Sequence, residues 1–91
     1  MKNAIVTGAS NGIGLEISKK LSENNYYVGM IDVDKDNLFK ESENIRNSVA
    51  IEGDVTSEDS IKNALNIFNK TPDLIVNNAG IVIFGGLEEQ S

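Results

Sequence analysis

The sequence predicts an α/β fold in which helices cover both faces of a parallel sheet. Short apolar runs alternate with segments of helical periodicity, which is typical of βαβ units. The runs are continuously apolar, as expected for strands that are buried on both faces. A glycine-rich segment follows the first run and begins the first helical segment. At 91 residues, against about 100–150 for a typical domain, we expect the chain to form a single domain.

Four apolar runs are predicted as strands. They cover residues 4–6, 26–31, 48–51 and 74–76. Connections between parallel strands are right-handed, which places the first strand inside the sheet. We therefore expect a doubly wound parallel sheet of about four strands, in the order 3-2-1-4, with three helices.

Three segments between these runs have the apolar spacing of helices. They cover residues 12–25, 35–45 and 57–70. In the first segment, Ile13, Ile17 and Leu21 are predicted to lie on one face. Asp34 is the predicted N-cap of the second helix. Thr56 is the predicted N-cap of the third, with Asp59 at the spacing of a capping box.

The composition excludes several classes of function. Eight basic and 14 acidic residues give a net charge of −6, which opposes binding to a phosphate backbone. The chain has no Cys and no His, so thiolate catalysis, Ser-His-Asp catalysis and the usual zinc sites are not expected. No run approaches the ~20 apolar residues of a membrane span, and the N-terminus does not resemble a signal peptide. A cytoplasmic location is the simplest expectation.

The segment from Thr7 to Gly14 reads Thr-Gly-Ala-Ser-Asn-Gly-Ile-Gly and has the pattern of a phosphate-binding turn. Gly8 would allow the sharp turn, Gly12 would let a pyrophosphate approach the backbone, and Gly14 would let the helix pack closely. The helix N-terminus would offer unpaired N–H groups. No Gly-Lys-Ser/Thr follows, so a P-loop is excluded. A glycine-rich turn that binds nothing is the alternative interpretation.

Asp32 lies 18 residues after Gly14, at the end of the second predicted strand. A carboxylate there can accept hydrogen bonds from both hydroxyls of the adenosine ribose. The same charge would repel a 2′-phosphate, and the turn holds no Lys or Arg to offset it, although Lys35 lies nearby in sequence. These features favour NAD over NADP. Alternatively, Asp32 only solvates the end of the strand.

Four segments in this order resemble the short-chain dehydrogenase/reductase family. They are residues 7–14, Asp32, Asp54-Val55 and Asn77-Asn78-Ala79-Gly80. The resemblance covers the whole chain but only about the first third of the family's usual length. It implies that residues 1–91 are a single partial dinucleotide-binding domain with a Rossmann-type fold, truncated to about four strands. It also implies that the chain is the NAD(H)-binding N-terminal part of an oxidoreductase. A flavodoxin-like fold is the alternative, but it does not explain Asp32 together with Asp54-Val55.

The resemblance also implies a role for each matching residue. Ser10, Asn11, Gly12, Ile13 and Gly14 would form the pyrophosphate turn that begins at Gly8. Asp32 would bind the ribose, Asp54 the adenine amino group, and Val55 would make an apolar contact beside it. Asn78, Ala79 and Gly80 would lie near the nicotinamide end, with Asn77 bracing the central strands. Read without the family, Asp54 could simply start a loop, and residues 77–80 could be an ordinary turn.

The family's catalytic Tyr-x-x-x-Lys pair has no counterpart in these 91 residues. Tyr26 and Tyr27 are followed four residues later by Met30 and Ile31, so both tyrosines are predicted to be packing residues. No catalytic or metal-binding residue is predicted, and we expect the chain alone to be inactive. The alternatives are a non-catalytic module that binds NAD or another adenine nucleotide, and an inert truncated relic.

The apolar runs 74–76 and 81–84 predict a partner at the edge of the sheet. An open apolar edge is a template for strand pairing, and natural proteins seldom leave one bare. We expect self-association there, or pairing with a missing C-terminal part.

Overall fold

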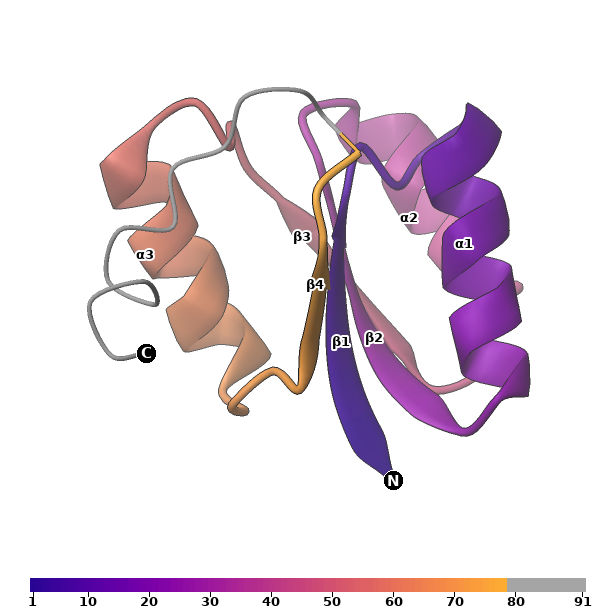
Figure 1. Ribbon diagram of the computed structural model, residues 1–91. Coiled ribbons are helices and arrows are strands. Elements are labelled where there is room, and N and C mark those ends of the chain that lie inside the picture. Colours follow the sequence, from indigo (N-terminus) through magenta and orange to yellow (C-terminus); the bar gives the residue numbers. More distant parts are fainter. Residues whose placement is uncertain (79–91) are drawn as a thin grey trace.

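The computed structural model describes residues 1–78 and contains seven elements in strict alternation of strand and helix. They are β1 (Lys2–Thr7), α1 (Gly12–Glu23), β2 (Tyr26–Asp32), α2 (Lys35–Ser42), β3 (Ser48–Glu52), α3 (Glu58–Phe68) and β4 (Leu74–Val76). All strand pairs are parallel and their order is β3-β2-β1-β4. Helices α1 and α2 cover one face of the sheet and α3 covers the other (Figure 1). The predicted fold class and strand order are confirmed.

The sheet separates two apolar cores, because successive side chains of a strand point to opposite faces. On the α3 side, Ile5 of β1 packs in a cluster with Ile31 and Phe68. On the other side, Val6 of β1 packs in a cluster with Met30 and Leu38. Strand β1 contributes to both cores, which is why its apolar run is continuous. Strands β3 and β4 are less buried because each lies at an edge of the sheet among the described residues.

All three helices end two or three residues before their predicted ends, and the predicted N-cap of α3 is wrong. Helix α2 ends at Ser42, three residues before the predicted end. The N-cap of α3 is Ser57, whose side chain accepts a hydrogen bond from the Ser60 amide. The hydroxyl of Thr56, the predicted cap, instead donates to Asp54 at 2.6 Å. The Asp34 cap is confirmed, since its side chain accepts a hydrogen bond from the Asn37 amide.

Parallel pairing brings the carboxyl ends of all four strands to one edge of the sheet. The turn from β1 into α1 lies at this edge, beside the ends of β2 and β4 (Figure 1). In an open α/β sheet, ligands bind at this edge. No helix of the described part is long and apolar enough to cross a membrane.

Candidate functional site

Three glycines shape the turn between β1 and α1. Gly8 and Gly12 have φ angles of 61° and 57°, in the left-handed region that glycine adopts without strain. A Cβ on Gly14 would lie 2.0 Å from the carbonyl oxygen of Gly8 and 2.7 Å from Nδ2 of Asn78. The close approach of α1 to the end of β1 therefore requires glycine at position 14. The sequence predicted this role for Gly14, namely to let the helix pack closely.

The outer side of the turn is open. Nothing lies within 4 Å of the position that a Cβ on Gly12 would occupy. Asn11 is the N-cap residue of α1, but its side chain makes no capping hydrogen bond, and it is exposed. The first N–H groups of a helix have no intrahelical acceptor, and they carry the positive end of the helix dipole. The turn can therefore accept an anionic group such as a phosphate.

The carboxylate of Asp32 joins the end of β2 to this turn. Its Oδ2 accepts a hydrogen bond from the Ser10 amide at 3.0 Å, and its Oδ1 accepts one from the Asp34 amide at 3.1 Å. A carboxylate has about four acceptor positions, so both oxygens can still accept hydrogen bonds from a ribose diol.

Asp32 remains ionised in this environment. Burial on its own raises the pKa of Asp32, but the hydrogen bonds from the Ser10 and Asp34 amides together hold that pKa below its ordinary value. The stability that these hydrogen bonds contribute is present above the ordinary pKa of an aspartate. It is lost as the pH falls through the lowered pKa.

Ser10 is a buried polar residue inside the turn, with 1% of its surface exposed. Its hydroxyl makes no hydrogen bond of normal geometry within residues 1–78. It nevertheless lies close enough to Asp32 to contribute to the lowering of that pKa. An unpartnered buried hydroxyl is costly, and a bound ligand that reaches the turn could supply the missing partner.

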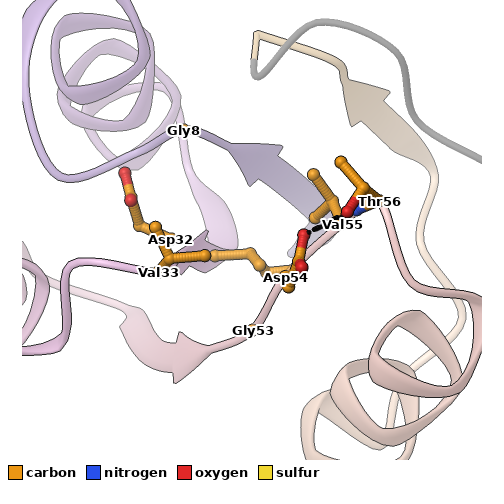
Figure 2. Close-up of a pocket in the computed structure, with 8 residues that line it drawn as sticks. Gly8, Asp32, Val33, Gly53, Asp54, Val55 and Thr56 are labelled. Atoms are coloured by element: carbon orange, nitrogen blue, oxygen red, sulfur yellow. Dashed lines mark hydrogen bonds between the residues drawn. The ribbon is translucent and has the colours of Figure 1, made fainter.

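A pocket of about 160 Å³ lies between the ends of β1, β2 and β3 (Figure 2). Asp32 points from it toward the turn at Gly8, whereas Asp54 points toward Thr56 (Figure 2). Its lining residues are Gly8, Ile31, Asp32, Val33, Gly53, Asp54, Val55 and Thr56. Apolar walls with carboxylates on two sides suit a heterocyclic base joined to a ribose.

The sequence did not predict Val33 as part of this pocket. Its side chain is 64% exposed. The sequence shows only that this valine directly follows Asp32. By contrast, Val55 was predicted as an apolar contact, and the structure places it in the pocket wall.

Asp54 lies at the pocket, but its carboxylate is engaged locally. Oδ1 accepts hydrogen bonds from the hydroxyl and the amide of Thr56, at 2.6 Å and 3.0 Å. These two bonds lower the pKa of Asp54. Asp54 therefore orders the start of the loop to α3, and its second carboxylate oxygen makes no hydrogen bond to the described residues.

Asn78 joins the end of β4 to the turn. Its amide N–H donates to Oγ1 of Thr7 at 3.0 Å, and its Nδ2 donates to the Gly8 carbonyl at 3.3 Å. Thr7 Oγ1 also lies 3.5 Å from Oδ1 of Asn77. These contacts brace β1 against β4. Two further predicted site residues, Ala79 and Gly80, lie outside the described residues.

Ile13, which was predicted to share a helix face with Ile17 and Leu21 and to form part of the pyrophosphate turn, has 70% of its surface exposed. Helix α1 begins at Gly12, so Ile13 stands in its first turn, where α1 extends past the sheet. Helical periodicity cannot show where a helix leaves the sheet that it covers. Ile13 is thus free to contact a ligand beside the turn.

The packing role predicted for the tyrosines is confirmed. Tyr26 and Tyr27 lie in β2 and pack against opposite cores. The ring of Tyr27 stacks on Phe68 with centroids 5.7 Å apart, and Nζ of Lys70 lies 5.3 Å from the Tyr27 centroid.

Comparison with known proteins gives a consistent match. The family model described as short chain dehydrogenase matches residues 2–91. An uncharacterized oxidoreductase from Thermotoga maritima is 32% identical, over 99% of this chain and 38% of its own length. A protein of Haemophilus influenzae described as a probable NADP-dependent dehydrogenase is 38% identical, over 93% of this chain and 34% of its own length.

A solved structure has the same fold. The 3-ketoacyl-(acyl-carrier-protein) reductase of Brucella melitensis, complexed with NADH, has a TM-score of 0.75 and 32% identity, over 88% of this chain and 34% of its own. The chain thus spans about a third of the length of the proteins that it matches.

Proposed function

The chain belongs to the short chain dehydrogenase family, and from this premise we propose that its glycine-rich turn and the end of β2 bind NAD(H) in preference to NADP(H). The family binds nicotinamide dinucleotides. The observation that carries the proposal is the hydrogen bond from the Ser10 amide to Asp32, at 3.0 Å. It places the candidate ribose acceptor directly beside the candidate phosphate-binding turn.

The residues fit the two halves of such a ligand. The open side of Gly12 and the N-terminus of α1 would receive the pyrophosphate. Asp32 would accept the ribose hydroxyls, and the adjoining pocket with Val33 and Val55 in its walls would hold the adenine. For Asp54 we propose a contact to the adenine through the carboxylate oxygen that Thr56 does not use.

The neighbouring residues extend the proposed site toward the nicotinamide. Ile13 is exposed in the first turn of α1, and Asn78 is bonded to the turn from β4. We propose that both lie beside the nicotinamide half, together with Ala79 and Gly80. Bound NAD(H) would serve as the hydride carrier of an oxidoreductase reaction. No residue of these 91 is assigned to the chemical step.

Isothermal titration calorimetry of the 91-residue chain with NADH and NADPH tests the preference. We expect NADH to bind about 10- to 100-fold more tightly. A 2′-phosphate would meet the negative charge of Asp32, which forms no ion pair among the described residues, at a cost of about 1–3 kcal/mol. Equal or tighter binding of NADPH would contradict the preference. Binding of neither cofactor would contradict the proposed function itself.

We also propose that the outer edge of β4 is covered by another copy of the chain or by a C-terminal part of a longer chain. Among the described residues β4 pairs with β1 alone, and Leu74 is 38% exposed. The N–H and C=O groups of the outer edge are thus available for pairing. In light scattering at about 100 μM, a concentration at which open edges associate, we expect dimers or larger species.

A lysine on an edge strand blocks pairing, so Leu74→Lys should shift the chain toward the monomer. The control is Ile67→Lys, where the isoleucine is 52% exposed but belongs to helix α3 and not to the edge strand. A folded monomer of the unaltered chain at this concentration would refute the edge proposal.

A further inference from the structure

A closed ring of hydrogen bonds joins the glycine turn, the end of β2 and the start of α2. The Ser10 amide donates to Oδ2 of Asp32 at 3.0 Å, and the Asp34 amide donates to Oδ1 of the same carboxylate at 3.1 Å. The Asn37 amide donates to Oδ1 of Asp34 at 3.3 Å. The side-chain Nδ2 of Asn37 closes the ring by donating to the carbonyl oxygen of Ser10.

The side chain of Asn37 takes no part in capping α2. Asp34 caps α2 through the backbone N–H of Asn37, and this bond forms with any residue except proline at position 37. The side-chain amide is half-buried and reaches back 27 positions in sequence to the turn. The hydrogen bond of this side chain therefore holds the Ser10 carbonyl in place and does not stabilise the start of α2.

Fixing the Ser10 carbonyl also fixes the N–H of the next residue. In a trans peptide the C=O and the following N–H lie in one plane and point in opposite directions, and no peptide bond in the described residues is cis. Because the Ser10 carbonyl points at α2, the Asn11 N–H must point away from it. No atom of residues 1–78 accepts a hydrogen bond from that N–H.

We propose that Asn37 is a positioning residue, which holds the Ser10–Asn11 peptide so that the Asn11 N–H faces the pyrophosphate. The inference rests on the proposed function and extends it to a residue outside the turn and outside the pocket wall. Asn37 does not touch the cofactor. It acts by preventing rotation of a peptide that would otherwise present a carbonyl oxygen, instead of a donor, to the phosphate.

The first test is made without ligand. Nuclear magnetic resonance of the labelled chain should show a scalar coupling across the hydrogen bond between Nδ2 of Asn37 and the Ser10 carbonyl carbon. The Asn11 amide resonance should shift in Asn37→Ala. Absence of the coupling together with an unmoved Asn11 amide in Asn37→Ala would overturn the proposal.

The second test separates the phosphate-binding end from the adenosine end. For Asn37→Ala we expect binding of ADP and NADH to weaken about 5- to 20-fold, as for the loss of one hydrogen bond to a charged group. Binding of adenosine, which has no phosphate, should change less than about twofold. A purely structural role would weaken all three ligands together, and that result would overturn the proposal.

The matched control is Asn44→Ala. The side-chain Nδ2 of Asn44 also donates to a backbone carbonyl, that of Lys40 at 3.3 Å, but near the end of α2 far from the turn. This variant should bind ADP, NADH and adenosine like the unaltered chain. Equal ADP binding by Asn37→Ala and by the unaltered chain would refute the role of Asn37 alone. Failure of the unaltered chain to bind ADP or NADH would instead refute the proposed function, and with it the role of Asn37.

Discussion

Gly14→Ala should destabilise the chain by about 2–3 kcal/mol, within the upper range for inserting an extra methyl group into a packed site. In a helix interior, alanine is otherwise favoured over glycine by about 1 kcal/mol. The expected loss therefore arises from the added Cβ, which would lie 2.0 Å from the Gly8 carbonyl oxygen. For a domain of this size the melting temperature should fall by about 10–20 °C. Circular dichroism during heating and in urea measures both quantities.

The control for this prediction is Gly53→Ala. A Cβ on Gly53 would meet only Cγ2 of Ile31, at 3.6 Å, which is an ordinary van der Waals distance. The free energy of unfolding of this variant should change by less than about 0.5 kcal/mol, as for most surface substitutions. If Gly14→Ala were as stable as Gly53→Ala, the close packing of α1 on the turn would be wrong.

Asp32→Asn should reduce the preference for NADH over NADPH about 10-fold or more. The substitution keeps an oxygen acceptor of the same shape but removes the charge that repels a 2′-phosphate. The expected change follows from the 1–3 kcal/mol assigned to that repulsion, at about 1.4 kcal/mol for each factor of ten. Binding of NADPH should improve or stay constant while binding of NADH weakens. Calorimetric titration of both cofactors gives the ratio.

Asp36→Asn is the control for net charge. Asp36 is exposed in the first turn of α2, and it takes no part in the hydrogen bonds of Asp32. Its removal alters the net charge of the chain by the same amount, so the cofactor ratio should change less than about twofold, as expected for a screened surface charge. An unchanged ratio in Asp32→Asn would show that Asp32 does not set the preference.

The sequence predicted the architecture because the signal for each strand and helix is local, and a general rule of topology then orders the strands. Continuous apolar runs marked the strands, and the rule of right-handed crossovers ordered them with β1 inside the sheet. What it did not predict depends on geometry between elements. The position of Ile13 depends on where α1 extends past the sheet, and the choice of Ser57 over Thr56 as a cap depends on the turn that Asp54 makes with Thr56.

In the candidate site, too, some residues could be predicted from the sequence, whereas others depend on how the elements pack together. Gly8, Gly12 and Asp32 carry residue-type signals, because few other residues suit a left-handed turn or a ribose contact at those positions. Asn37 carries no such signal. Its contact with Ser10 spans 27 positions and exists only because parallel pairing of β1 and β2 brings α2 beside the turn. Val33 lines the pocket because parallel pairing brings the ends of β1, β2 and β3 together.

The most direct test of the central claim is a titration of the ¹⁵N-labelled chain with NADH, followed by the amide resonances. The account predicts saturable shifts at Ser10, Asn11 and Gly12 in the turn, and at Asp32 and Val55 in the pocket, while the exposed face of α3 stays unchanged. No saturable shift, or shifts confined to residues away from the carboxyl edge of the sheet, would contradict it.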